Sequence, residues 1–431
     1  MAEEEFKAAV GMSREWDAYG AGHEVATNTL DQLGEKPDFI LLFATIHYEK
    51  HGGFEKFLEG VWDVLPKGTP LIGGTVGGFI NPQGCFTRGA TAIAVKYPGM
   101  DVGIGIGYNT KRNPKNAARN CTRMIIKKLE GSKYNNKFLY SLMSGSIVPE
   151  FPGFKGGRRI FPGFLGRMSI LLSPFLNILG KGAGKEEEML DELSRNMPNQ
   201  SILTGSCMDS GLFVKNYQFF YNKITTNTVV GIGIQTDLII NVEREHGLTT
   251  TNKNFKVTSL SKDKRIIHEI NNKPALKEFL HILGWPYDFI DERLHRRTLF
   301  YPMGIKKSGR WMASVIGLVL ENSFLMTDKT LDNDICILSG SGKGWTNAVN
   351  NILSNNKLMR YQPMTRIIIS CAVRLEGLGN QIYKTHKLLL DFFKDIPFLG
   401  IYVSGEGLCD PIRGVEYGNE TFNLVTFSKK L

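Results

Sequence analysis

Three short, nearly continuous apolar runs stand out along the chain. They lie at residues 39–44, 138–143 and 367–372. Runs of this length without polar alternation are typical of strands that are buried on both faces of a sheet. Each run is preceded, about 30 residues earlier, by a strand end rich in small residues and then a helical stretch, a typical length for one supersecondary unit. Those strand ends lie at residues 10–13, 106–109 and 337–340.

Each apolar run is also followed by a helical stretch, a second strand that runs into glycines, and a further strand. The strands that run into glycines lie at residues 71–75, 202–206 and 399–407. The further strands lie at residues 91–95, 228–232 and 423–427. The same order in three places predicts a triplicated strand–helix–strand–helix–strand unit. The fold class is therefore α/β, with repeated units forming mixed sheets in a two-domain chain.

The glycine-rich strand ends indicate a candidate ligand site. Loops that follow the carboxyl ends of neighbouring parallel strands gather at one edge of a sheet, which is where ligands bind. Glycine lets the backbone come close to a ligand and leaves its N–H groups exposed. For any single copy, a simple tight turn is the alternative interpretation.

A different glycine pattern occurs at Gly103, Gly105 and Gly107. Residues two apart in a strand point to the same face of the sheet. These three glycines therefore predict a strand face against which a helix packs closely, rather than a dinucleotide-binding loop.

Composition narrows the cellular setting. The acidic residues 1–5 lack the basic start and apolar run of a signal peptide. The six cysteines include no Cys-x-x-Cys pair, which fits reduced thiols better than disulfides or a structural zinc site. We therefore expect a cytoplasmic protein.

The formal net charge of +10 raises nucleic acid or an anionic membrane as a partner. Much of the excess lies in residues 111–128, where cations alternate with apolar residues at the spacing of a helix. No RNA- or DNA-binding motif accompanies this segment, so we interpret it as the solvated face of a helix and expect no nucleic-acid partner.

The third copy carries the most specific motifs. Residues 370–374 read Ser-Cys-Ala-Val-Arg, residues 397–406 read Pro-Phe-Leu-Gly-Ile-Tyr-Val-Ser-Gly-Glu, and residues 419–421 read Asn-Glu-Thr. This series resembles the C-terminal half of the FIST domain, whose pattern is Cys-x-x-Arg, then Pro-Leu-x-Gly-Phe-Tyr running into Gly-Glu, then Asn-x-Thr. Residues 245–247, 272–275 and 301–305 resemble further elements of that family, and residues 38–44 and 71–78 match its N-terminal half more loosely.

The resemblance implies a FIST N-terminal-like domain at residues 1–245 and a FIST C-terminal-like domain at residues 246–431. It implies a small-molecule sensor in signal transduction and not an enzyme, with an amino acid or organic acid as ligand. The chain has no room for an output domain, so we expect it to act through a separate signalling protein. Two departures from the family pattern, Gly418 before Asn419 and Asn380-Gln381 in place of a glutamate pair, leave the ligand open.

The motif residues form the predicted ligand site. Arg374 offers a bidentate contact to a carboxylate, and a structural pair with Glu406 is the alternative. Asn419 and Thr421 provide polar contacts or cap a turn. The predicted ligand-binding set is Arg374, Glu406, Asn419, Thr421, Cys371 and His246.

Three other functions stay open at this point. A hydrolase or transferase using Cys371 would need an activating base, and buried strand cysteines are usually inert. Because some FIST relatives bind heme, a heme-based gas sensor with His246 or His47 as axial ligand is another alternative, although Cys-x-x-Cys-His is absent. His47 and His51 lack the pattern of a metal site. The main interpretation therefore includes no metal and no cofactor.

Residues 150–185 form an insertion that the other copies lack. Its apolar stretch is interrupted by Arg167 and two prolines, and a membrane-spanning helix needs about 20 mostly apolar residues, so this is not a transmembrane segment. The insertion forms a lid over the ligand site, lies on an anionic membrane, docks a partner, or packs as extra helices on the core. The membrane alternative makes a membrane-associated scaffold the third open function.

Overall fold

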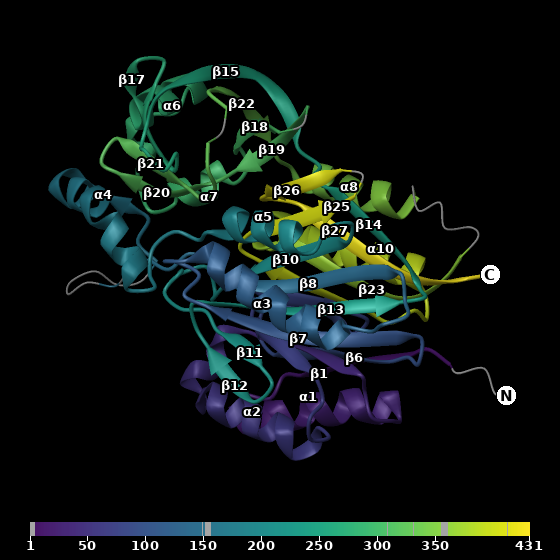
Figure 1. Ribbon diagram of the computed structural model, residues 1–431. Coiled ribbons are helices and arrows are strands. Elements are labelled where there is room, and N and C mark those ends of the chain that lie inside the picture. The colour runs from purple at the N-terminus through teal and green to yellow at the C-terminus, as the bar shows by residue number, and fades with distance from the viewer. Residues whose placement is uncertain are drawn as a thin grey trace.

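Three six-stranded sheets form the body of the protein, and a nine-stranded sheet lies beside them (Figure 1). The computed structural model describes residues 5–148, 150, 157–307, 309–330, 332–354, 361–411 and 413–431. All four sheets are joined with helices in one α/β fold, which confirms the predicted fold class.

The first sheet is built mainly from the N-terminal unit. In spatial order it contains β1 (Lys7–Ser13), β6 (Ala90–Lys96), β2 (Phe39–Ala44), β3 (Leu71–Thr75), β11 (Gln218–Phe220) and β12 (Lys223–Thr225). Helices α1 (Ala18–Leu33) and α2 (Gly53–Val64) cover its outer face, and the 3-10 helix η1 (Ile46–Lys50) follows β2. The side chain of Asp17 caps the start of α1 by accepting a hydrogen bond from Gly20 N–H, and Gly34 ends it in the left-handed conformation.

The second sheet has the same order of strand types. It contains β7 (Met100–Tyr108), β13 (Thr228–Thr236), β8 (Asn136–Ser144), β10 (Ser201–Cys207), β25 (Glu406–Asp410) and β26 (Gly414–Gly418). Helices α3 (Pro114–Leu129) and α5 (Glu186–Asn196) cover its outer face.

The third sheet repeats this order. It contains β14 (Ile239–Glu245), β27 (Phe422–Lys430), β23 (Tyr361–Cys371), β24 (Phe398–Val403), β4 (Gly78–Asn81) and β5 (Gly84–Phe86). Its helices are α8 (Gly342–Ser354), α9 (Ala372–Leu378), η3 (Gly379–Gln381) and α10 (Ile382–Phe393). In each sheet the two central strands are parallel: β2 with β3, β8 with β10, and β23 with β24.

Each sheet is completed by a hairpin from a different unit. The hairpin β4–β5 pairs with β24, the hairpin β11–β12 pairs with β3, and the hairpin β25–β26 pairs with β10. The exchange is cyclic, so every sheet depends on hydrogen bonds to a segment far away in the sequence.

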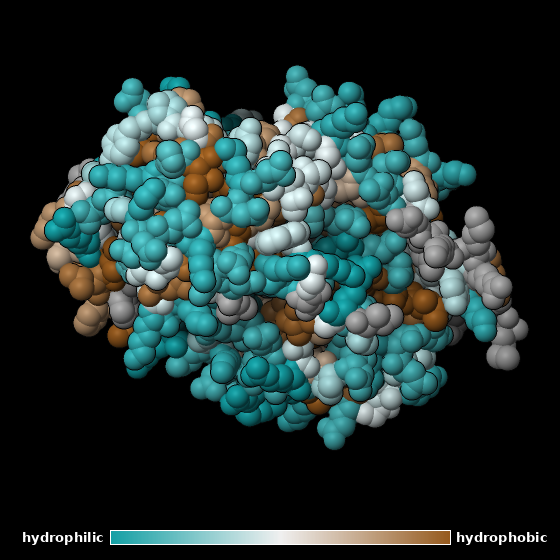
Figure 2. All heavy atoms as spheres, turned by 90° about the horizontal axis from the view of Figure 1, so that it is seen from above, coloured by the Kyte–Doolittle hydropathy of each residue, from teal (hydrophilic) through white to brown (hydrophobic). Residues whose placement is uncertain are grey.

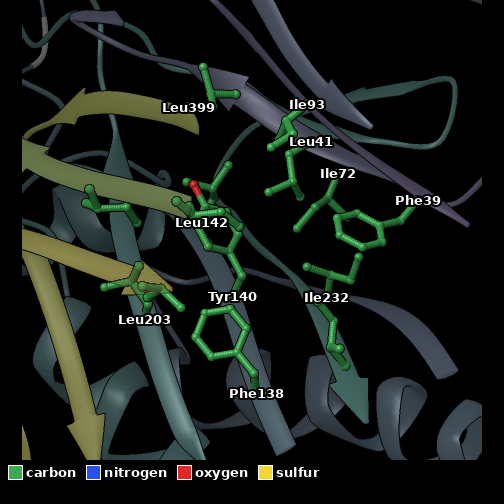
Figure 3. Close-up of a cluster of buried hydrophobic side chains, with 14 of the residues drawn as sticks. Phe39, Leu41, Ile72, Ile93, Phe138, Tyr140, Leu142, Leu203, Ile232 and Leu399 are labelled. Atoms are coloured by element: carbon green, nitrogen blue, oxygen red, sulfur yellow. The ribbon is translucent and has the colours of Figure 1, made fainter. Parts of the chain in front are cut away.

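The three sheets face a common apolar core (Figure 3). Because side chains alternate along a strand, one half of each buried strand faces this core and the other half faces the outer helices. In β2, for example, Leu41 lies in the shared core while Ile40 and Leu42 pack against α1 and α2. The buried runs predicted from the sequence are therefore confirmed as strands covered on both faces.

The predicted glycine face of β7 is also confirmed. A Cβ atom added at Gly105 or Gly107 would overlap the backbone carbonyl oxygen of Cys121 or Ala117 in α3, and one at Gly103 would lie 2.9 Å from the carbonyl oxygen of Ile125. The missing side chains let α3 rest directly on the strand.

The fourth sheet is inserted between β14 and α8. Its strands, in spatial order, are β19 (Arg310–Ser314), β18 (Met303–Lys307), β22 (Asp334–Ser339), β15 (Thr249–Leu260), β16 (Ile266–Ile270), β21 (Ser323–Met326), β20 (Ile316–Leu320) and β9 (Ile160–Phe161), with β17 (Lys273–Pro274) paired to β16. It carries α6 (Ala275–Leu283), η2 (Tyr287–Phe289) and α7 (Leu294–Thr298) around a core of its own. Strand β9 comes from the insertion at residues 150–185, which continues into α4 (Gly163–Ile178).

This inserted sheet corrects one prediction. Residues 337–340 were expected to open the third unit, but they belong mostly to β22 in the fourth sheet. The position in the third sheet is filled by β14, which pairs with β27 as β1 pairs with β6. The prediction was wrong because β22 leads directly into a helix, as an opening strand would, while its pairing partners could not be read from spacing.

The predicted boundary at residue 245 coincides with the end of β14, where the chain leaves the body for the fourth sheet. Two of the three body sheets contain strands from both sides of this boundary. Its role as a domain boundary stays a prediction. Within the described ranges, no helix is long and apolar enough to cross a membrane.

Candidate functional site

A cavity of about 720 Å³ lies between the body and the fourth sheet. Its floor is formed by residues just beyond the carboxyl ends of the parallel strands in the second and third sheets: Ser146, Met208, Ala372 and Ser404. The opposite wall comes from the fourth sheet, with Leu318, Leu320 and Met326 among its side chains. The cavity therefore lies at the strand edge that the sequence marks as the candidate ligand site.

Helix α4 supplies a third wall. Leu165, Met168, Leu172 and Leu176 recur at helical spacing and line the cavity. Helix α4 of the insertion thus takes part in enclosing the cavity. The interpretation of the insertion at residues 150–185 as a lid over the ligand site stays a prediction.

The cavity lining contains several cations, and most of them already have partners. The Arg159 guanidinium donates to the carbonyl oxygens of Gly211 (2.8 Å) and Gly317 (3.2 Å) and lies over the Phe213 ring. Arg265 pairs with Glu187 at 2.5 Å, and Arg296 pairs with Glu376 at 2.7 Å. These three arginines hold the cavity walls together.

Lys185 differs from these arginines. It lines the cavity, and in the described part of the chain its ammonium group has no hydrogen bond or ion pair. Burial lowers the pKa of Lys185, as expected for an ammonium group removed from water, and the positive charge of Arg265 adds to this effect. Lys185 is therefore a donor available to an anionic ligand.

The Asn177 side chain complements Lys185. It also lines the cavity, and its buried Oδ1 atom accepts no hydrogen bond from any described residue. Burying an acceptor without a donor raises the free energy of the folded protein. A ligand group that donates a hydrogen bond to Asn177 Oδ1 removes this penalty and therefore strengthens binding. The cavity thus offers an unused donor and an unused acceptor within an apolar lining.

His295, in α7, is the histidine of the cavity lining. Its Nδ1 lies 3.1 Å from the carbonyl oxygen of Ile316, and burial lowers its pKa to about 4. The ring is therefore neutral at physiological pH. Because a carbonyl can only accept, Nδ1 carries the proton and Nε2 is left as an acceptor.

The six residues predicted as a ligand site are divided by the structure. Cys371 and Asn419 line the cavity, whereas Arg374, Glu406, Thr421 and His246 do not. The latter group lies around the turn at residues 419–421, and Arg374, Glu406 and Thr421 are almost completely buried. Their role in contacting a ligand stays a prediction.

Arg374 is used entirely within the protein. It is 1% exposed, and its guanidinium donates to the carbonyl oxygens of His246 (3.2 Å), Glu420 (3.4 Å) and Trp345 (2.7 Å). These three carbonyls belong to segments far apart in the sequence. Among the described residues no ion pair joins Arg374 to Glu406, so the alternative of a direct structural pair is replaced by a set of bonds to the backbone.

Two buried carboxyl groups lie next to Arg374. Thr421 donates to Glu406 Oε2 from both its backbone N–H (3.3 Å) and its hydroxyl (2.9 Å), and burial raises the pKa of Glu406 to about 7. Glu420 has a φ of 61°, unusual for a residue with a side chain, and burial raises its pKa well above the ordinary value. These buried carboxyl groups lie next to Cys371, which lines the cavity.

The cysteine and the paired histidines provide little reactive chemistry. Burial raises the pKa of Cys371 well above its ordinary value, which opposes formation of the nucleophilic thiolate. Burial likewise lowers the pKa of His47 to about 4, and the rings of His47 and His51 are 5.9 Å apart. Among the residues whose placement is described, no group of three or more His, Cys, Asp or Glu side chains is arranged to hold a metal ion.

Sequence reasoning did not identify Asn177, Lys185 or His295 as site residues. No motif surrounds these positions. Asn177 interrupts the apolar stretch of the insertion and Lys185 follows it, but Arg167, Ser169 and Lys181 are placed in the same way, so their positions in the sequence do not single them out. For His295 no signal exists either, because its place in the cavity depends on the fourth sheet.

The fold and the cavity together define the class: an α/β protein with a ligand-sized cavity between a three-sheet body and an inserted sheet. The chain belongs to the FIST N domain family, whose family model matches residues 38–273. No curated protein matches the sequence.

Among solved structures the similarity is weak. A cyanuric acid hydrolase from A. caulinodans aligns with a TM-score of 0.28 at 7% identity, over 55% of this chain and 72% of that chain. PurLQS from Thermotoga maritima aligns with a TM-score of 0.19 at 12% identity, over 98% of this chain and 72% of that chain. Neither similarity carries an argument about activity.

Proposed function

We propose that this protein binds a small organic acid or amino acid in the cavity and transmits the bound state to a separate signalling protein. The observation that carries the proposal is the cavity itself, which has the volume of a small-molecule site and a mainly apolar lining with few unused polar groups. Membership of the FIST N domain family, which is associated with small-ligand sensing, supports the same function.

Lys185 and Asn177 suggest the ligand's chemistry. Lys185 favours an anionic group such as a carboxylate, and Asn177 Oδ1 favours a group that donates a hydrogen bond, such as an ammonium or hydroxyl. Leu165, Leu172 and Leu320 favour an apolar remainder. An apolar amino acid or hydroxy acid combines these three features.

A route from the cavity to the rest of the protein supports a role in signalling. Arg265 borders the cavity and pairs with Glu187, and Lys329 pairs with Glu188 at 2.7 Å. Glu187 and Glu188 lie in the first turn of α5 on the body, whereas Arg265 and Lys329 belong to the inserted sheet region. A ligand beside Arg265 therefore acts directly on the junction between the two parts.

The test is isothermal titration of the purified protein against a panel of apolar amino acids, hydroxy acids and simple carboxylates. We expect at least one to bind, and Lys185→Gln to weaken that binding by about tenfold or more, because a charged hydrogen bond is lost. The matched control is Lys181→Gln, four residues earlier, exposed and outside the cavity lining. No binding across the panel, or equal binding by wild type and Lys185→Gln, would contradict the proposal.

A heme-based sensor is the second candidate, and His295 is the observation that favours it. Neutral imidazole with Nδ1–H donating to a backbone carbonyl is the common arrangement of a histidine that ligates a metal through Nε2. His246 and His47, the axial ligands considered from sequence, do not line the cavity. If heme is the cofactor, His295 is therefore the residue that would hold it.

An absorption spectrum after addition of hemin tests this candidate. Heme bound through His295 gives a Soret band that His295→Ala shifts or removes and His246→Ala leaves unchanged. A spectrum identical to that of free hemin rejects a heme site. A Soret band that persists in His295→Ala rejects His295 as the ligand.

A further inference from the structure

Helix α4 has a second apolar face that points into solvent. Phe164, Leu171, Phe175 and Ile178 are 74%, 68%, 63% and 58% exposed. At 3.6 residues per turn these four positions fall in one stripe, on a side of the helix different from the one that lines the cavity. Figure 2 shows hydrophobic side chains gathered at the edge of the molecule where α4 lies.

An exposed stripe of this kind needs an explanation. Single exposed apolar residues are normal on protein surfaces, but a contiguous set of large ones marks an interaction site. Leu179, next to the end of the helix, is 72% exposed and extends the stripe by one more side chain. We refer to these five residues, Phe164, Leu171, Phe175, Ile178 and Leu179, as the α4 stripe.

A basic surface begins beside the α4 stripe. Helix α3 contains five cations and no Asp or Glu, and with Arg112 just before it these cations are all exposed: Arg112, Lys115, Arg119, Arg123, Lys127 and Lys128. Within the described ranges only Arg119 of this set forms an ion pair, with Glu192. The positive charge of this surface is therefore largely uncompensated.

Contacts to Asn227 bring the two features together. Thr110 and Lys111, just before α3, hydrogen-bond to Asn227 Oδ1 at 2.9 Å each. On the other side, Gly180 packs so closely on the Asn227 amide that an added Cβ would lie 2.9 Å from its nitrogen. The C-terminal end of α4 and the N-terminal end of α3 are thus neighbours, and Lys181, which directly follows Gly180, is exposed.

We propose that this surface docks on a membrane rich in anionic lipid, with α4 lying in the plane of the interface. The α4 stripe enters the boundary between headgroups and acyl chains, and the cations of α3 contact anionic headgroups. At 16 residues α4 is too short to span a bilayer, for which about 20 apolar residues are needed, so it lies on the surface.

Charge favours a lipid surface over a second copy of the chain. Pairing two copies through this surface would bring two strongly basic helices together in a protein whose net charge is already +10. An anionic membrane instead complements both features at once, because it offers apolar chains next to negative charge. The proposal is independent of the ligand in the cavity.

Vesicle sedimentation with the full chain tests the proposal. We expect the wild type to bind vesicles of phosphatidylcholine and phosphatidylserine in equal parts, and to bind pure phosphatidylcholine vesicles at least about tenfold more weakly. The double variant Phe164→Glu with Phe175→Glu should lose about tenfold or more in binding to the mixed vesicles. Its control is Tyr383→Glu, which replaces an equally exposed aromatic residue on α10.

A second pair of variants keeps α4 intact. Lys115→Glu with Arg123→Glu reverses charge on α3 and should weaken binding about tenfold, with the salt dependence of binding reduced. Lys67→Glu, an exposed lysine after α2, is the control. Equal binding by wild type and both double variants, or no binding to anionic vesicles, would overturn the proposal. A dimer in solution that the α4 variant dissociates, without vesicle binding, would assign the stripe to self-association instead.

Discussion

Arg374 connects parts of the protein that are far apart in the sequence. Its guanidinium holds the carbonyl oxygens of Trp345 in α8, His246 after β14 and Glu420 in the turn before β27. Lysine has a single ammonium group and lacks the planar fork of arginine, so it cannot satisfy the same three acceptors in this geometry. In the structure Arg374 therefore links three segments around the third sheet, and its predicted contact with a ligand stays a prediction.

Replacing Arg374 should therefore destabilise the fold. Arg374→Ala removes three hydrogen bonds from a buried guanidinium to backbone carbonyls, and we expect it to lower the free energy of unfolding by about 4 kcal/mol. Urea denaturation followed by circular dichroism measures the loss. The control Arg296→Ala removes an exposed ion pair with Glu376 and should cost about 1 kcal/mol or less. A small effect of Arg374→Ala would contradict the role assigned to it.

Glu406 makes stability depend on pH. Burial raises its pKa from 4.5 to about 7, so the folded state holds this proton more tightly than the unfolded state. The corresponding stabilisation is fully present below pH 4.5 and is lost as the pH rises through 7. By linkage, the wild type should lose about 3 kcal/mol more stability between pH 5 and pH 8 than Glu406→Gln, which does not titrate.

Denaturation curves at pH 5 and pH 8 test this difference. Glu35→Gln is a suitable control, because Glu35 is an exposed partner of Lys7, and its pH dependence should follow that of the wild type. If Glu406→Gln also follows the wild type, Glu406 is not the titrating group.

At the residue scale, the motifs predicted a single site for Cys371, Asn419, Arg374 and Glu406, whereas only Cys371 and Asn419 line the cavity. All four belong to the same motif series. They differ in the direction of their side chains and in the residues that cover them. Lys185 and Asn177, two polar residues of the cavity lining, lie in an insertion whose strand β9 pairs with another sheet. Spacing along the chain carries no information about such contacts.

At the scale of elements, β7 and α3 give the sharpest test of packing. Gly105→Ala or Gly107→Ala adds a methyl group where the α3 backbone already lies, and we expect a loss of about 1–3 kcal/mol per substitution from overpacking. Thermal or urea unfolding measures it. Gly20→Ala in α1 is the matched control, since the nearest atom to its added Cβ is 3.5 Å away. That control should be neutral or gain up to about 1 kcal/mol.

Individual elements were the most predictable part of this fold. The buried strands β2, β8 and β23 have apolar residues on both faces. This pattern can be recognised without knowing which strands and helices pack beside them. The opening strand of the third unit was misassigned because β22 leads directly into α8, as an opening strand would, and only hydrogen bonding shows that β14 is the strand that joins the body. The strands of the fourth sheet are mostly short and partly exposed, which weakens their pattern further.

At the scale of the whole molecule, the exchanged hairpins make the body one cooperative unit. A fragment of residues 1–245 lacks β25–β26, which closes the second sheet beyond β10, and β24, the partner of β4. We expect this fragment to show no cooperative unfolding transition, because both open edges expose unpaired backbone groups. Adding residues 246–431 as a separate chain should restore the transition. Cooperative unfolding of the fragment alone would instead support residues 1–245 as an independent domain.

The same hairpin exchange affects how the chain folds while it is being synthesised. The hairpin β4–β5 is complete by Phe86, but β24 does not begin until Phe398. At translation rates of about 5–20 residues per second, the hairpin waits for its partner for something on the order of tens of seconds. During that time the growing chain carries an unmatched strand edge that other nascent chains can join. We therefore expect a chaperone that shields this strand edge during synthesis to reduce aggregation of the growing chain.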